Sequence, residues 1–262
     1  MGRVKVGIGY ILGCLLSVLL WRFDRQVIYE RINEIIKNKL KSAVVIEFTY
    51  IILVALICYL FSFVKIVEIS NFITAFLVID ISNTERKNLK RKERVHFYDS
   101  ISTISRSMIC GFIAPLLFIA IGGNILGIAY SLVYNIWYCN EELNVFKYLC
   151  TIMNILPSII GDIILYVVYI FRNKSVKVDF KGDFFKNLFI RPLLNIDIFA
   201  AFIESVNFYY YFDNSNTSFL KSYGHYNNKI DQSCIKDYLS IAYGTCLIIF
   251  ICFFILVVNM AK

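Results

Sequence analysis

The sequence predicts an all-α, polytopic integral membrane protein. Of its 262 residues 58% are hydrophobic and 18% are charged, and the mean hydropathy of +0.65 lies well to the apolar side of a soluble domain. Residues 111–130 carry no charge, and this segment is long enough for a helix to cross a bilayer. Because only helices and closed barrels satisfy every backbone polar group in hydrocarbon, we expect spanning helices packed into a single membrane domain, residues 1–262.

Six apolar segments are candidate membrane spans, at 6–20, 43–64, 66–81, 108–138, 145–171 and 239–258. The third is short and contains Glu68 and Asp80, which is typical of a re-entrant or interfacial segment. Pro115 and Gly122-Gly123 break the fourth, and a more polar segment, 195–212, is a weaker seventh candidate. We therefore expect about five to seven transmembrane or re-entrant helices.

The N-terminal apolar run follows Arg3 and Lys5, as in a secretory signal, but it ends in basic and aromatic residues at 21–25 and not in a small-residue cleavage site. We expect an uncleaved first helix. In the segment that follows, apolar residues recur at helical spacing, namely Ile28, Ile32, Ile35, Ile36 and Leu40. This spacing predicts an amphipathic helix that lies on the inner membrane surface or packs on the bundle.

Lysine and arginine concentrate in three stretches, at 22–41, 86–94 and 172–191. Short cytoplasmic loops retain such residues, so the predicted orientation places segment 22–42, loop 82–107 and loop 172–238 in the cytoplasm, the last with an interfacial or re-entrant part. The acidic turn 139–144 is expected on the outer side. The net charge of +8 then reflects topology and contacts with anionic membrane lipid. Nucleic acid is not an expected partner, because no recognition motif accompanies the charge.

Metal sites and soluble catalytic signatures are not predicted. Most of the eight cysteines lie in apolar runs, no Cys-x-x-Cys pair occurs, and His96 and His225 are the only histidines. The sequence also contains no phosphate-binding loop, dinucleotide-binding fingerprint or serine nucleophile elbow.

The order of residues in the fourth apolar segment resembles the cobalamin-biosynthesis CobD/CbiB membrane family, the adenosylcobinamide-phosphate synthases. That family has a Gly-x-x-Ala-Pro-Leu run, a Gly-Gly pair and an Ala-Tyr. The matching residues here are Gly111, Ala114, Pro115, Leu116, Gly122, Gly123, Ala129 and Tyr130. Weaker similarity continues at 154–157, 207–212 and 221–224. The family's acidic and amide-bearing stretch falls on Ser102, Arg106, Ser107, Ile109 and Cys110, so no carboxylate survives there.

The resemblance implies an amide-forming ligase of the cell membrane, the bacterial inner membrane, that joins adenosylcobyric acid to an aminopropanol phosphate. It implies ATP and magnesium as cofactors, a corrinoid as substrate and other cobalamin-pathway proteins as partners. The candidate catalytic residues are Asp99, Ser102 and Arg106, and the candidate substrate-binding residues are Asn154, Asn207, Tyr211, Lys221 and Gly224.

Several of these residues also have structural explanations. Arg106 is suited to an anionic phosphate, yet it is equally typical of a positive-inside flank. Asn154 is placed to hydrogen-bond a carbonyl freed by Pro157. The aromatic residues 208–212 are typical of a membrane interface, and a corrinoid ring stacked on them is the alternative.

Asp162 is a stronger functional candidate on physical grounds, because a carboxylate inside hydrocarbon costs about 2.5 to 3.5 kcal/mol and persists when it has a partner or a task. Two other classes of function stay open. The chain is a degenerate relative that acts as a membrane binding or assembly subunit, as the missing carboxylates favour, or it is a small-molecule transporter with a site at the broken helix.

Overall fold

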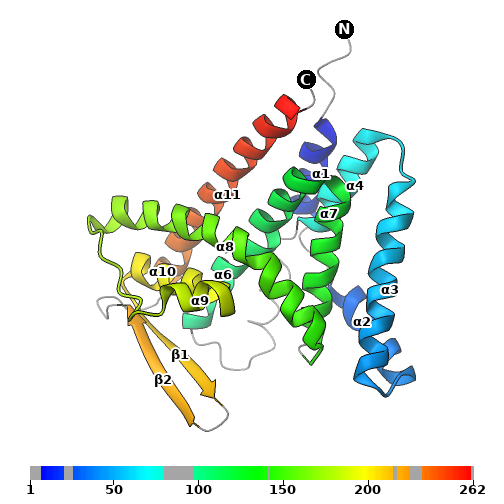
Figure 1. Ribbon diagram of the computed structural model, residues 1–262. Helices are drawn as coiled ribbons and strands as arrows, with labels where there is room; N and C mark the ends of the chain where they lie inside the picture. Colours follow the sequence, from blue (N-terminus) through cyan, green and yellow to red (C-terminus); the bar gives the residue numbers. More distant parts are fainter. Residues whose placement is uncertain are drawn as a thin grey trace.

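The computed structural model describes residues 7–20, 26–79, 97–140, 142–214, 217–224 and 232–260. The elements, in chain order, are α1 (Ile8–Leu19), α2 (Gln26–Lys39), α3 (Ala43–Ser62), α4 (Val67–Val78), α6 (Phe97–Met108), the π-helix η1 (Ile109–Ile113), α7 (Ala114–Cys139), α8 (Asn144–Asn173), α9 (Phe184–Ile190), α10 (Pro192–Glu204), β1 (Asn207–Asn214), β2 (Thr217–Gly224) and α11 (Gln232–Met260). The expected all-α membrane class is confirmed, with one small β-hairpin added (Figure 1).

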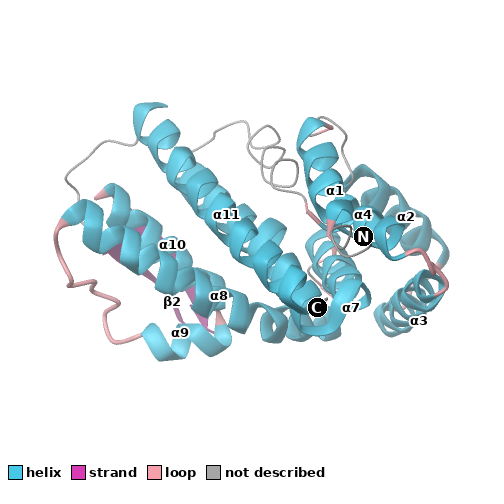
Figure 2. Ribbon diagram, turned by 90° about the horizontal axis from the view of Figure 1, so that it is seen from above, coloured by secondary structure: helices cyan, strands magenta, loops and turns pink. Residues whose placement is uncertain are grey.

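Four helical segments are long and apolar enough to cross a membrane by length and composition: Ala43–Ser62, Ile101–Cys139, Asn144–Asn173 and Gln232–Asn259. They coincide with four of the six predicted spans. α3 is the most peripheral, with 11% of its apolar window buried in the protein, so most of its surface is available to lipid. Viewed from above, α11 runs between α8 and α10 on one side and α1 to α4 on the other (Figure 2).

The other two predicted spans form short helices, α1 and α4, of 12 residues each. Twelve residues rise about 18 Å, well short of a hydrocarbon core of about 30 Å. The two helices run parallel and in close contact, because a Cβ added at Gly13 would lie 2.5 Å from the carbonyl oxygen of Phe72. The carboxylate of Glu68 also accepts hydrogen bonds from the amides of Gly7 (3.0 Å) and Gly9 (2.6 Å), at the start of α1.

The amphipathic helix predicted after the first span is α2, and it packs on the bundle. Ile36 and Leu40 lie against the core, while Ile28 and Ile35 are exposed. Asn33 is buried and donates to the carbonyl oxygen of Cys139 at 3.1 Å. Its own amide oxygen accepts a hydrogen bond from Tyr50 on α3 at 2.9 Å.

The broken apolar run 108–138 reverses direction. Gly122 and Gly123 have non-helical backbone angles, and Gly123 has φ +72°, a left-handed value that favours glycine. Phe118 stacks on Tyr130 with ring centroids 4.9 Å apart, although a straight helix would separate these residues by about 18 Å. α7 is therefore two limbs of a helical hairpin, and Figure 1 shows the second limb returning toward α2.

This reversal corrects two expectations from the sequence. The turn 139–144 was expected on the opposite side from segment 22–42, but Cys139 contacts Asn33 of α2, and the amide of Val145 donates to Glu47 of α3 at 3.1 Å. The run was counted as one crossing, whereas it folds back at Gly122-Gly123. The expected loop 82–107 is helical from Phe97 onward as α6, and its basic residues at 86–94 lie outside the described residues.

The buried centre is α10, which packs between α6 and α8 and is covered on nearly every side. α8 changes direction along its length (Figure 1), and Pro157 inside it removes one helical hydrogen bond. The weaker candidate span 195–212 does not form one helix. α10 ends at Glu204, Ser205 takes a left-handed conformation, and the consecutive aromatic residues from Phe208 form a strand.

Candidate functional site

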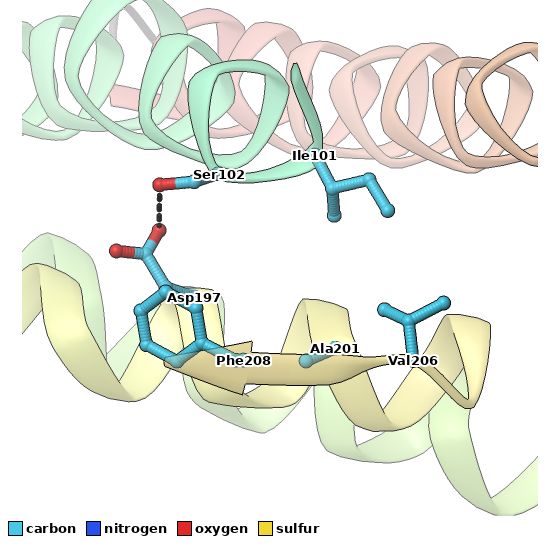
Figure 3. A pocket seen from close by; sticks show the side chains of 6 residues that line it. All are labelled: Ile101, Ser102, Asp197, Ala201, Val206 and Phe208. Atoms are coloured by element: carbon cyan, nitrogen blue, oxygen red, sulfur yellow. Dashed lines mark hydrogen bonds between the residues drawn. The ribbon is translucent and has the colours of Figure 1, made fainter. Parts of the chain in front are cut away.

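A charged cluster joins α6 to α10. Ser102 and Arg106 are one helical turn apart on α6 and face Asp197 of α10. The Ser102 hydroxyl donates to Asp197 Oδ1 at 2.8 Å (Figure 3), and Arg106 donates to Oδ2 from Nη2 at 2.7 Å and from Nε at 3.3 Å. Two of the three predicted catalytic residues thus share one carboxylate.

The cluster is buried on one side and open on the other. The Asp197 side chain is 0% exposed and that of Arg106 is 40% exposed. Burial raises the pKa of Asp197 above its ordinary value, and the guanidinium and the Ser102 hydroxyl act against that rise. The carboxylate therefore depends on Arg106 for its charged state, while Arg106 keeps contact with solvent.

A small pocket adjoins the cluster. Its lining residues come from α6, α10 and the start of β1: Ile101, Ser102, Asp197, Ala201, Val206 and Phe208 (Figure 3). Its cavity volume is about 10 Å³, far below the roughly 300–1,000 Å³ of sites that enclose a small organic ligand. The pocket therefore has room for about one water molecule and cannot enclose a corrinoid.

Asn207 and Gly224 pair at the base of the hairpin, beside this pocket. Asn207 lies between two lining residues, and its side chain turns to the other face of the strand and donates to the Tyr209 hydroxyl at 3.4 Å. Gly224 has φ +89°, and a Cβ there would lie 2.1 Å from the carbonyl oxygen of Val206. This close approach gives Gly224 a structural role in closing the hairpin onto α10.

Lys221 belongs to a separate group of cations and aromatic rings on the hairpin. It forms an ion pair with Asp183, and the Tyr223 hydroxyl lies 3.4 Å from the same carboxylate. Burial raises the pKa of Tyr223 to about 12, with Asp183 contributing. Arg191 lies 4.8 Å from the centre of the Phe212 ring. These contacts stabilise the hairpin against α9.

Asn154 is 1% exposed and lies between α7 and α8. Its amide oxygen accepts from the Tyr130 hydroxyl at 2.8 Å, and its amide nitrogen donates to the Cys150 sulfur at 3.2 Å. The predicted bond to the carbonyl freed by Pro157 is therefore not made. Asn154 links the returning limb of α7 to α8, away from the pocket.

The remaining two predicted site residues are placed only by their backbones. Asp99 lies on the first turn of α6 and Tyr211 on β1 opposite Leu220, and both side chains are outside the described part of the structure.

Asp197 escaped the sequence prediction, although it carries the geometry of the site. Its signal was a single carboxylate inside the apolar run that forms α10. The residue does not fit a magnesium ligand, because Arg106 at 2.7 Å already supplies its counter-charge. Within the described residues no three His, Cys, Asp or Glu side chains are grouped closely enough to hold a metal ion.

The break at Gly122-Gly123, where a transporter site was the alternative expectation, contains a polar network between helices. Asn124 accepts from the Tyr10 hydroxyl at 2.6 Å and donates to Ser70 at 2.9 Å and Asn71 at 2.8 Å. The amide at the break is thus bound by α1 and α4.

The architecture defines a helical membrane protein with a polar cluster beside a small pocket. Comparison with protein-family models, with curated proteins and with solved structures gives no match.

Proposed function

We propose that this chain is a membrane-embedded binding or assembly subunit related to the CobD/CbiB synthases, without ligase activity of its own. The ion pair between Arg106 and Asp197 carries the proposal. Arg106 is the candidate phosphate ligand, and its charge is balanced at 2.7 Å by a fully buried carboxylate. Amide formation driven by a nucleoside triphosphate needs positive charge at the developing phosphoryl groups, and a neutralised guanidinium supplies little of it.

In this proposal the protein resides in a bacterial cell membrane and binds a corrinoid for other cobalamin-pathway proteins. A corrinoid is far larger than the pocket, so in this proposal it lies on the surface of the hairpin next to the pocket. Phe219, which shares a face of the hairpin with the pocket residue Phe208, offers exposed aromatic surface there, at 41% exposure.

Two measurements on the same chain, one in growing cells and one on purified protein, test the proposal. The full chain is expressed in a bacterial strain that lacks its own synthase and is fed cobyric acid, and the same chain is purified in detergent with adenosylcobyric acid. We expect no restored growth, together with corrinoid absorbance that migrates with the protein. Restored growth contradicts the loss of chemistry, and an absence of bound corrinoid contradicts the binding role.

The second candidate is an active adenosylcobinamide-phosphate synthase. The observation in its favour is that Ser102 of α6 and Asp197 of α10 meet the start of β1 around one pocket, and that Arg106 bonds the same carboxylate. If the chain is this enzyme, it restores growth, Arg106→Met abolishes the restoration, and Lys236→Met, at an exposed position of α11, leaves it intact.

A further inference from the structure

A second buried polar cluster lies between α8 and α10, away from the Arg106–Asp197 pair. Asp162 on α8 is 4% exposed, and Ser158, one turn earlier on the same face, is 0% exposed. Asn195 of α10 lies beside Asp162 and is also 0% exposed. Three polar side chains from two helices are thus enclosed together in the interior.

The oxygen atoms of this cluster lack donors. Within the described residues, no hydrogen bond of ordinary geometry reaches either carboxylate oxygen of Asp162, the hydroxyl oxygen of Ser158 or the amide oxygen of Asn195, although the Asn195 side chain lies close enough to interact with the Asp162 carboxylate. The orientation of the Asn195 amide is set by its nitrogen, which donates to the carbonyl oxygen of Phe184 at 3.1 Å. Four buried acceptors without a donor are costly in any protein interior, since nearly all such groups are paired.

Neighbouring cations are engaged elsewhere. Arg106 bonds Asp197, and Arg172, nearly three turns further along α8, bonds Glu204 and Asp237. Next to Asp162, α8 packs so closely that a Cβ at Gly161 would meet the side chains of Ile109 and Ile196 at 2.3 and 2.9 Å. The site is therefore flanked by apolar side chains, and among the described residues no ion pair joins a cation to Asp162.

The donor set indicates the class of ligand. Carboxylate, hydroxyl and amide oxygens together are the ligands of hard cations. One carboxylate balances one positive charge, so a monovalent ion leaves the interior neutral, whereas a divalent ion would leave an uncompensated buried charge. Magnesium is further disfavoured because it keeps several of its waters, for which an apolar enclosure offers few partners.

We infer that Asp162, Ser158 and Asn195 form a binding site for a dehydrated alkali-metal cation between α8 and α10. The ion holds the two helices together at the buried centre of the fold, and it accounts for the donor-free oxygens of all three side chains. The inference is independent of the proposed corrinoid function.

Thermal unfolding of the full chain in lipid nanodiscs tests the site. Melting temperatures are compared in sodium, potassium and choline chloride at equal concentration. An alkali cation in roughly hundredfold excess over its dissociation constant raises the melting temperature by about 5–10 °C over choline. Asp162→Asn abolishes this difference, and the control Asp179→Asn, at an exposed carboxylate beyond the end of α8, retains it.

Two results would overturn the inference. Equal melting temperatures of the wild-type chain in the three salts mean that the carboxyl group is protonated and binds no ion. A cation effect that persists in Asp162→Asn places the ion elsewhere. If Asp162→Asn does not fold, Ser158→Ala replaces it: loss of one neutral oxygen shifts the salt titration to higher concentration, and an unchanged midpoint contradicts the site.

Discussion

Removing Arg106 is expected to destabilise the fold more than removing the charge of its partner. Asp197 has no exposed side-chain surface, whereas Arg106 is 40% exposed. Arg106→Met therefore leaves an uncompensated buried carboxylate, which costs about 3–5 kcal/mol. Asp197→Asn leaves a guanidinium that solvent still reaches and an amide that can still bond Ser102, so its cost is closer to one charged hydrogen bond, about 1.5–3 kcal/mol.

The assay is equilibrium unfolding in mixed micelles, with helix content as the readout and the double variant Arg106→Met/Asp197→Leu completing the cycle. We expect the double variant to be near neutral, since well-packed apolar residues often replace a buried ion pair without loss. A larger loss in free energy of unfolding for Asp197→Asn than for Arg106→Met contradicts this expectation. So does a double variant whose loss equals the sum of the two single losses.

Three further results are expected. Gly13→Ala pushes α1 about 0.9 Å from α4, from 2.5 Å to an ordinary 3.4 Å contact, and costs about 1–3 kcal/mol in thermal unfolding. The control Gly244→Ala is at an exposed position where no described atom lies within 4 Å of the added Cβ, and it gains up to about 1 kcal/mol. Burial raises the pKa of Glu204, so the folded state binds the carboxyl proton more tightly than the unfolded state does. This proton binding adds to the free energy of unfolding in full below about pH 4.3, and the contribution is lost as pH rises through the raised pKa. Glu204→Gln therefore flattens the dependence of the free energy of unfolding on pH. Cysteines placed at Lys39 and Glu142 react with an impermeant reagent from the same side of the membrane, and labelling from opposite sides contradicts the reversal in α7.

The sequence predicts the long helices because their signal is local. The long apolar runs of α3 and α8 predict helices because, in hydrocarbon, a helix satisfies the backbone polar groups whatever the segment packs against. The direction of α7, by contrast, is not determined by local sequence. Gly122-Gly123 permits a kink or a reversal, and the choice depends on the stacking of Phe118 on Tyr130 and on the bonds of Asn124 to α1 and α4.

The same difference between local sequence signals and tertiary contacts applies to the candidate site. Ser102 and Arg106 are four residues apart, so helical spacing alone places them on one face. Their shared partner Asp197 lies 91 residues after Arg106, and tertiary packing alone brings it there. The hairpin was missed for a different reason. Its five consecutive aromatic residues, 208–212, favour a strand by propensity, but they are equally typical of a membrane interface.

The hydrogen bonds between Glu68 and the start of α1 affect the order in which the helices reach their final positions. The amides of Gly7 and Gly9 emerge from the ribosome first, and their acceptor is made 59 residues after Gly9. A helix of 12 residues is too short to settle across a bilayer unaided. The first helix therefore reaches its final position only after α4 has been synthesised, and the close packing at Gly13 holds it there together with the bonds to Glu68.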